Sequence, residues 1–207
     1  MQLGGLLIGL GNPGKEYVNT RHNLGFIFVD YILAEAINQQ VRVEKLASKK
    51  HYELWKIHFS TPAGHAPWLV LKPLSYMNNS GIPTREVADY YNVDTETIVV
   101  AHDEMDIPFG EMRFKFAGGA AGHKGILSIA QHLNSQNFYR IRLGIGKSRN
   151  HAATIGHVLG SFSKNDEPAI KAMLVCAGNG FELFRMDNFK EAQQVINGFK
   201  LPENNNA

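Results

Sequence analysis

Short apolar segments separated by turn residues mark the predicted strands of this chain. Two continuous runs, Leu6–Leu10 and Ile98–Ala101, are bounded by turn or polar residues, which is typical of buried strands. Four alternating segments predict further strands: Tyr52–Phe59, Trp68–Lys72, Arg113–Phe116 and Arg140–Leu143. In the last two, the alternation places the basic side chains on one face of the strand.

Apolar residues three or four positions apart predict helices between and after these strands. The predicted helices are Leu24–Asn38, Thr84–Tyr91, Ile126–Leu133, a segment from Ala169 to Phe181, and Asn188–Phe199. Ser163 and Asp166 resemble a capping box ahead of the fourth helix. Strands that alternate with helices predict an α/β protein. No internal repeat or linker divides the chain, so we expect one domain over residues 1–200 and a disordered tail over 201–207.

The composition limits the classes of protein to which the chain can belong. Its 207 residues, 44% hydrophobic and 19% charged, suit one globular domain with a packed core. Its apolar runs fall far below the ~18 to 20 residues of a membrane-spanning helix. The N-terminus lacks the basic start and the cleavage site of a signal peptide, so we expect a cytoplasmic protein that does not cross a membrane. The single cysteine, Cys176, lies in an apolar run and is predicted to be a buried helix residue.

Basic residues are concentrated in one part of the chain. Between Met112 and Arg149 there are seven lysines and arginines and no acidic residue. The rest of the chain has 14 basic and 19 acidic residues, so the two parts carry +7 and −5 although the formal net charge is only +2. This asymmetry favours a polyanionic partner. On charge alone, a solvated basic face is the alternative.

The segment Gly9–Gly14 fits the pattern GxGxxG after a predicted strand, so dinucleotide binding must be considered. That fingerprint requires a helix that opens inside the glycine motif and an acidic residue at the end of the next strand. Here the residues after Gly14 have no apolar period, and Asp30 lies inside a helical pattern. The motif is therefore interpreted as a tight turn that holds the Asn12 side chain at the carboxyl end of a strand.

His22 lies in a polar segment just before the first predicted helix, where its imidazole is expected to be accessible. Histidine is the usual general base near neutral pH, and Asp103 can orient the ring. A His–Asp pair without an obvious Ser or Cys nucleophile indicates activation of water. The alternative is a metal site, with ligands drawn from His102, Glu104, Asp106 and His123. No compact metal-ligand motif is present to support it.

The loop Lys72–Gly81 combines an aromatic ring, a thioether and two amides, which come from Tyr76, Met77, Asn78 and Asn79. An aromatic ring can stack on a base, and an amide can bind a carbonyl or a hydroxyl group. Each residue taken alone is more often a packing or turn residue. Together they make the loop a candidate substrate-binding segment.

Taken together, these segments resemble bacterial peptidyl-tRNA hydrolases from about Leu6 to Phe199. The N-terminal motifs that carry the resemblance are Gly9–Tyr17 and Thr20–Phe26. Further motifs follow in order: Lys72-Pro73, Tyr76–Asn78 with Ser80-Gly81, His102–Asp106, Gly122-His123 with Gly125, and Arg140–Gly146. Several specific motifs in one order are not expected by chance.

The resemblance implies a single α/β domain that has a mixed central sheet and helices on both faces. It implies a metal-independent, cofactor-free and monomeric esterase whose partner is peptidyl-tRNA. The reaction would hydrolyse the ester between a peptide, or an N-blocked aminoacyl group, and the 3′-terminal ribose of tRNA. The freed tRNA would return to translation.

The resemblance also implies roles for individual residues. His22 matches the catalytic base, Asp103 the residue that keeps it basic, and Asn12 the residue that helps to distinguish blocked from free aminoacyl groups. The residues implied to contact the substrate are Tyr17, Tyr76, Met77, Asn78 and Lys124. The residues implied to lie near the tRNA backbone are Arg113, Lys115 and Arg142.

One position departs from the family pattern. Lys124 follows His123 where the family usually has an asparagine, so the contact made there is left open. Two other functions also stay open at this point. They are a non-catalytic RNA-binding protein that retains the basic face and a metal-dependent hydrolase.

Overall fold

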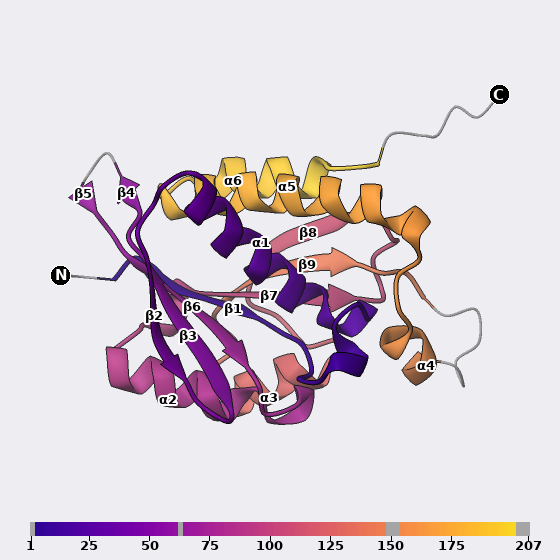
Figure 1. Ribbon diagram of the computed structural model, residues 1–207, viewed down its shortest axis with the longest axis horizontal. Coiled ribbons are helices and arrows are strands. Elements are labelled where there is room, and N and C mark those ends of the chain that lie inside the picture. The colour runs from indigo at the N-terminus through magenta and orange to yellow at the C-terminus, as the bar shows by residue number, and fades with distance from the viewer. Residues whose placement is uncertain (1–2, 62–63, 148–153, 202–207) are drawn as a thin grey trace.

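A seven-stranded mixed sheet with helices on both faces forms this protein (Figure 1). The computed structural model describes residues 3–61, 64–147 and 154–201. The strands of the sheet are β1 (Gly5–Gly9), β2 (Val43–Ser48), β3 (Tyr52–Ile57), β6 (Trp68–Pro73), β7 (Ile98–Glu104), β8 (Met112–Phe116) and β9 (Tyr139–Gly144). The helices are α1 (Leu24–Asn38), α2 (Gly81–Tyr91), α3 (Lys124–Leu133), α4 (Thr154–Leu159), α5 (Glu167–Arg185) and α6 (Phe189–Gly198). A small ribbon pairs β4 (Ser60–Thr61) with β5 (Gly64–His65). The predicted α/β class with a mixed sheet is confirmed.

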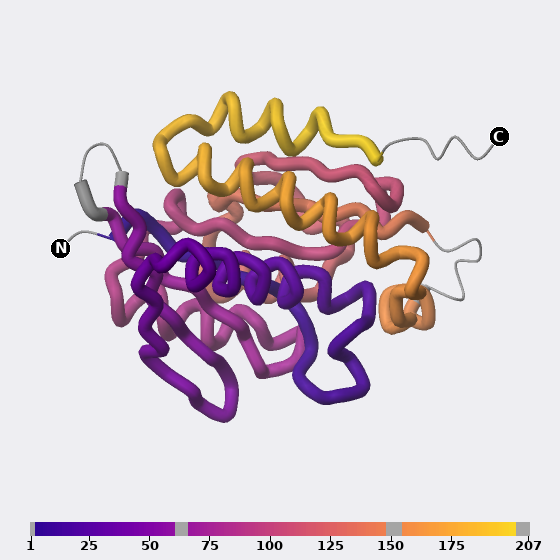
Figure 2. Tube along the Cα trace, turned by 45° about the horizontal axis from the view of Figure 1, so that its top comes forward, coloured from indigo at the N-terminus to yellow at the C-terminus, as the bar shows by residue number. Residues whose placement is uncertain are grey.

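Each face of the sheet has its own hydrophobic core. Helices α1, α5 and α6 cover one face and α2 and α3 the other, and Figure 2 shows α5 and α6 side by side. Leu7 of β1 belongs to the first core, whereas Leu6 and Ile8 belong to the second. Because successive side chains of a strand point to opposite faces, a strand covered on both sides must be apolar throughout. The continuous apolar run at the start of the chain therefore marks a central strand.

The order of the strands brings several loops to one edge of the sheet. The order is β2-β3-β6-β1-β7-β9-β8, and β6, β1, β7 and β9 are parallel. The chain leaves β1 through α1 on one face and leaves β6 through α2 on the other. Where the connections diverge in this way, the carboxyl ends of neighbouring strands border a crevice. The loops after β1 and β6 meet the end of β7 there.

One strand prediction needs correction, and one strand was not predicted. The strand predicted to end at Ala101 continues as β7 to Glu104. His102, Asp103 and Glu104 are polar but buried, and they stay in the ladder with β9, where His102 lies opposite Arg142. Strand β2 was not predicted, because an irregularity in its pairing with β3 breaks the alternation.

The helix predictions hold with shifted ends. Helix α1 has the predicted bounds, whereas α2 and α3 begin earlier than predicted, at Gly81 and Lys124. The capping box of Ser163 and Asp166 is confirmed. Cys176 lies in α5 but is only half-buried, which corrects the prediction of a buried residue. Its Sγ donates a hydrogen bond to the Val195 carbonyl, and burial raises the pKa of the thiol.

Two further predictions concern the ends and surfaces of the molecule. Among the residues that the structure describes, no helix is long and apolar enough to cross a membrane. Of the predicted tail, Leu201 lies against Gly110, and residues 202–207 lie outside the described residues. Arg149, the last of the seven basic residues, also lies outside them.

Candidate active site

A pocket of about 490 Å³ opens at the edge where the carboxyl ends of β1, β6 and β7 meet. Its walls also include the start of α3 and the short helix α4. The predicted site residues that line it are Asn12, His22, Tyr76, Met77, Asn78, Asp103 and Lys124. Residues far apart in the sequence are thus brought to one cavity by the topology of the sheet.

Asn12 is fixed in the loop after β1 by hydrogen bonds that involve Asn23 and Met77. The main-chain N of Asn12 donates to Asn23 Oδ1 at 2.8 Å, and Asn23 Nδ2 donates to Asn12 O at 2.9 Å. The main-chain N of Met77 donates to Asn12 Oδ1 at 2.8 Å. Asn12 Nδ2 has no hydrogen-bond partner among the described residues, so it is available to a bound group. The side chain of Asn12 is thus held by the main chain of Met77 rather than by the glycine turn alone, which corrects the prediction.

The chain after Gly14 does not follow the dinucleotide fingerprint. A 3₁₀ turn, η1 (Lys15–Tyr17), comes next, and helix α1 begins only at Leu24. Asp30 lies inside α1 and pairs with Lys72 at 2.8 Å. The interpretation of the glycine motif as a tight turn is therefore favoured by the structure.

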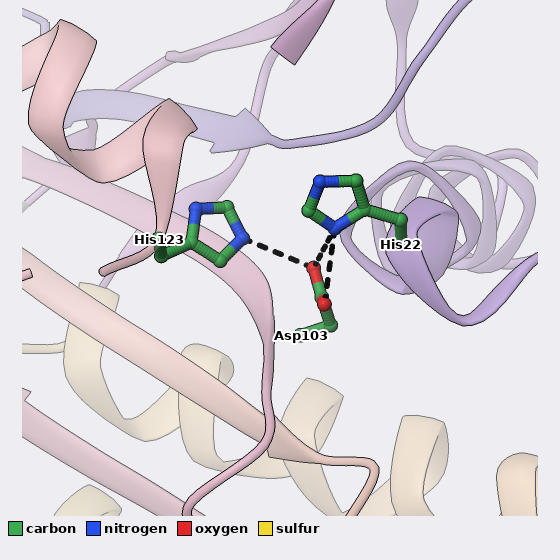
Figure 3. A group of neighbouring side chains, drawn as sticks. All are labelled: His22, Asp103 and His123. Carbon is green, nitrogen blue, oxygen red and sulfur yellow. Dashed lines mark hydrogen bonds and ion pairs between the residues drawn. The ribbon is translucent and has the colours of Figure 1, made fainter. Parts of the chain in front are cut away.

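His22 and Asp103 form the centre of the site (Figure 3). His22 lies in η2 (Arg21–Asn23), just before α1, and its Nδ1 is 2.9 Å and 3.1 Å from the two carboxylate oxygens of Asp103. A carboxylate accepts hydrogen bonds, so Nδ1 carries the proton that it donates. Nε2 of the neutral ring therefore has a free lone pair, which is the state of a general base.

A second histidine approaches Asp103 from the opposite side. His123 Nε2 lies 3.0 Å from Asp103 Oδ1, as Figure 3 shows. The Nδ1 atom of His123 accepts from the main-chain N of Ile126 and caps α3, so Nε2 carries the proton. Asp103 thus receives N–H donors from both histidines. From the sequence, His123 was a candidate metal ligand in one alternative, and its contact with Asp103 was not predicted.

The surroundings of Asp103 keep it ionised. Its side chain is 2% exposed, and this burial alone would raise the pKa of the carboxyl. The charges and hydrogen bonds of His123 and His22 outweigh burial and hold the pKa of Asp103 well below its ordinary value. An ionised Asp103 favours the protonated imidazole that forms when His22 accepts a proton.

His102 packs behind this pair. Its Nδ1 donates to the Asp103 main-chain carbonyl at 2.7 Å, and its ring lies edge-on to His123 with centroids 4.7 Å apart. Burial is the main cause that holds the pKa of His102 well below its ordinary value, and the charge of His123 adds to the effect. His102 is therefore neutral near pH 7.

The loop after β6 presents its side chains to the pocket from a strained backbone. Tyr76 has a φ of 58°, a left-handed conformation that is uncommon for a residue with a side chain, and it is 55% exposed. Met77 is buried and Asn78 is exposed. The structure thus gives Tyr76 and Asn78 accessible positions at the mouth of the pocket.

Of two further predicted substrate contacts, one lines the pocket and the other does not. Lys124 is the first residue of α3, is exposed and lines the pocket beside His123. Tyr17 lies in η1 and does not line this pocket among the described residues. The role predicted for Tyr17 stays a prediction.

The predicted tRNA-backbone residues lie outside the pocket on one face of β8 and β9. Arg113 is opposite Arg142 and Lys115 is opposite Arg140 in the ladder, so the basic residues of each strand share one face, as the alternation predicted. Arg142 Nη2 pairs with Glu104 at 2.9 Å, and Arg113 pairs with Glu111 at 2.9 Å. Lys115 has no ion-pair partner among the described residues. Burial and the nearby charges of Arg140 and Arg142 lower the pKa of Lys115.

Helix α4 forms a wall of the site that the sequence analysis did not predict. Ile155, Val158 and Leu159 line the pocket, and Ile155 is 72% exposed. His157 Nε2 is 2.9 Å from the Gly146 carbonyl, and the main chain of Arg21 donates to the Gly160 carbonyl at 3.0 Å. The helix is therefore tied both to the end of β9 and to the turn that carries His22. A helix of six residues is too short for a helical period to be recognised in the sequence.

The structure changes the composition of the candidate metal site. His22, Asp103 and His123 have ligand atoms within 4.8 Å of one another. Of the residues named in the sequence analysis only His123 belongs to this group, because Glu104 binds Arg142 and Asp106 binds Lys147. Within the described residues, both histidine nitrogens of the group face Asp103 at hydrogen-bond distance. The carboxylate of Asp103 is therefore paired with N–H groups of the two histidines.

Comparisons with known proteins cover nearly the whole chain. The model of the family described as peptidyl-tRNA hydrolase matches residues 6–204. The peptidyl-tRNA hydrolase of Nitratidesulfovibrio vulgaris (strain DP4) is 47% identical over 97% of this chain and 100% of its own length. That of Clostridium botulinum (strain Hall) is 40% identical over 95% of this chain and 98% of its own. The crystal structure of peptidyl-tRNA hydrolase from Acinetobacter baumannii superimposes with a TM-score of 0.84 at 33% identity, covering 97% of this chain and 98% of that one.

Proposed function

The chain belongs to the peptidyl-tRNA hydrolase family, and from this premise we propose how its pocket hydrolyses peptidyl-tRNA. The bond cleaved is the ester between the carboxyl end of a peptide, or of an N-blocked aminoacyl group, and the 3′-terminal ribose of tRNA. The observation that carries the proposal is the bond from His22 Nδ1 to the buried Asp103, at 2.9 Å. It leaves Nε2 of His22 as the basic atom.

His22 acts as the general base. Its Nε2 removes a proton from a water molecule, and the resulting oxygen attacks the ester carbonyl carbon. The imidazolium that forms is stabilised by the ionised Asp103, as in other His–Asp pairs. The same proton then passes to the 3′ oxygen of the ribose as the tetrahedral intermediate collapses. A free peptide acid and a free tRNA hydroxyl result.

Asn12 and Asn78 position the peptidyl end. The Oδ1 atom of Asn12 is already occupied by Met77, so its Nδ2 is the group that faces the substrate. An amide N–H can donate to a peptide carbonyl or to the oxyanion of the intermediate. The exposed ring of Tyr76 provides a flat surface at the mouth of the pocket.

The basic residues on β8 and β9 serve as the tRNA-binding face. The ammonium of Lys115 is available to a phosphate, because it lacks an ion-pair partner among the described residues. Arg142 is linked to the pocket through Glu104, which lines the pocket. Phosphate contacts of this kind position the nucleic acid without reading its sequence. A monomer in the cytoplasm, with no resident cofactor, is part of this proposal.

The direct test is the release of free tRNA from an N-acetylated aminoacyl-tRNA. Wild-type protein should release tRNA at the same rate with and without EDTA, and the unblocked aminoacyl-tRNA should react much more slowly. Loss of activity with EDTA that Zn²⁺ restores would support a metal-dependent hydrolase instead. Binding without any release would support a non-catalytic RNA-binding protein.

A further inference from the structure

The geometry points to Arg140 as a positioning residue that holds the loop before α3, and with it His123, in place beside Asp103. This inference rests on the proposed function, because it concerns how the same site is kept in order for ester hydrolysis. Arg140 lies on β9 and is 2% exposed. Among the described residues, no carboxylate pairs with it.

The partners of Arg140 are three successive carbonyl groups. Its Nη1 donates to the Gly119 carbonyl at 2.8 Å, and its Nη2 donates to the Gly118 carbonyl at 2.7 Å and to that of Ala117. A planar guanidinium can direct several donors at once to acceptors in a fixed arrangement. The loop that follows β8 is therefore held at its beginning by one buried side chain.

This loop has a backbone that needs to be held. Ala117 and Ala121 have φ angles of 55° and 48°, and Gly118 and Gly122 have φ angles of 99° and 80°. The left-handed conformation is unfavourable for alanine and persists only where the surroundings impose it. Arg140 binds the carbonyl groups of Ala117 and Gly118. Without the guanidinium, we expect the loop to relax to a different path.

A relaxed loop would disturb the catalytic pair. Ala121, Gly122, His123 and Lys124 line the pocket at the far end of the loop. His123 Nε2 lies 3.0 Å from Asp103, which is on β7, and β7 pairs directly with the strand that carries Arg140. Arg140 thus holds the beginning of the loop that leads to His123, and Asp103 on the neighbouring strand binds His123 at its end. A shift of about 1 Å at a reacting centre can lower the rate about 100-fold.

A direct contact between Arg140 and tRNA is the competing role, and burial argues against it. The guanidinium is covered by the loop, whereas Lys115 and Arg142 on the same face are partly accessible. The two roles predict different kinetics. A phosphate contact acts on the KM of full-length tRNA, whereas a positioning residue acts on kcat for any substrate that uses the site.

The first experiment compares Arg140→Lys with Arg85→Lys, a matched change on the exposed face of α2. Each is assayed on N-acetylated aminoacyl-tRNA and on the same ester attached to a short acceptor-end oligonucleotide. For Arg140→Lys we expect kcat to fall about 10- to 100-fold on both substrates, with KM for full-length tRNA changed less than about threefold. Arg85→Lys should match the wild type. A rise in KM for full-length tRNA alone would overturn the inference.

The second experiment disturbs the same contact from the loop side, so it does not depend on the folding of an Arg140 variant. A Cβ atom at Gly118 would lie 2.8 Å from Lys115 Nζ and 3.0 Å from Arg140 Nη2, whereas a Cβ at Gly119 would meet nothing within 4 Å. The φ of 99° at Gly118 also disfavours alanine there, so the substitution displaces the beginning of the loop, and circular dichroism checks that this exposed change leaves the fold intact. We expect Gly118→Ala to lower kcat on both substrates and Gly119→Ala to leave it unchanged. Equal kcat values for the two folded variants would overturn the inference.

An NMR measurement separates this inference from the proposed function. The Nε2 proton of His123 that is bonded to Asp103 should give a slowly exchanging imidazole signal, identified by its loss in His123→Asn. The signal should shift or broaden in Arg140→Lys and Gly118→Ala but not in Gly119→Ala. An unchanged signal would overturn the positioning role, whereas failure of wild-type hydrolysis would overturn only the proposed function.

Discussion

At the scale of single residues, His22 is held by the carboxylate of Asp103 and lines the pocket rather than the basic face. We expect His22→Ala to lower kcat by about 10²- to 10⁴-fold, because it removes the general base. Binding of tRNA should remain within error of the wild type, since Lys115 and Arg142 are unchanged. Single-turnover kinetics and filter binding measure the two quantities. Retention of most of the activity would contradict the role of His22.

Asp103→Asn tests the orientation of that base. An amide can donate to His22 Nδ1, which would move the imidazole proton to Nε2 and abolish the free lone pair there. We expect kcat to fall at least about 100-fold, with little change in KM. The mutant should remain folded by circular dichroism. An unchanged kcat would mean that another group orients His22.

Lys124 tests whether a positive charge at the rim of the pocket acts on the base. Its ammonium disfavours a second positive charge on His22, so the acidic limb of kcat/KM should lie at lower pH in the wild type than in Lys124→Asn. Because Lys124 is exposed, solvent and salt weaken the effect, and we expect a displacement of less than about half a pH unit. The displacement should shrink as salt is added. Superimposable limbs at low salt would show that Lys124 does not influence His22.

At the scale of elements, the pair of strands β8 and β9 carries basic residues with different bonding. Lys115 is unpaired among the described residues, whereas Arg142 binds the buried Glu104. Lys115→Gln should therefore reduce the slope of log affinity against log salt by about 0.7 to 0.9 without loss of stability. Arg142→Gln should do the same and also lower the free energy of unfolding by about 1 to 3 kcal/mol, because Glu104 loses its partner. Titration of tRNA binding with salt and urea unfolding test this difference.

The oligonucleotide substrate provides the control for these two variants. A short acceptor end lacks the tRNA body, so its KM should change much less than that of full-length tRNA. Equal changes in KM on both substrates would indicate that Lys115 and Arg142 act in the pocket instead.

At the scale of the whole molecule, the buried histidine of β7 makes stability depend on pH. Burial holds the pKa of His102 below its ordinary value, so the unfolded chain takes up this proton more readily than the folded one. Its contribution to stability is therefore present above pH 6.5 and is lost as the pH falls below it. The titration of His102 changes the free energy of unfolding by at most about 1.4 kcal/mol per pH unit. Asp103 has a lowered pKa, so its own contribution is lost only near and below pH 4.

His102→Asn isolates the contribution of His102. An amide does not titrate in this range, so the free energy of unfolding should fall less steeply between pH 6.5 and 5 than in the wild type. Urea unfolding at several pH values measures the two slopes. Parallel slopes would contradict the assignment of a buried, neutral His102.

Much of the site was visible in the sequence because its chemistry sits in compact motifs. Asn12 in a glycine turn, His22 before an amphipathic helix and Asp103 at the end of an apolar run are each local signals. The contribution of α4 was not visible, because a single turn and a half of helix leaves no periodicity. The role of His123 was not visible either, since it depends on the distance between two residues that lie on different elements.

The sequence by itself determined the α/β class, the central apolar strands and the start of α1, because burial on both faces of a sheet and on one face of a helix leaves a periodic pattern. The tertiary structure alone decided which polar residues became buried within strand β7 and which basic residues stayed unpaired. It also decided that two histidines share Asp103 and that Arg140 binds three carbonyl groups. The physical reason is that bonds between distant segments depend on how elements pack. Local periodicity carries no record of that packing.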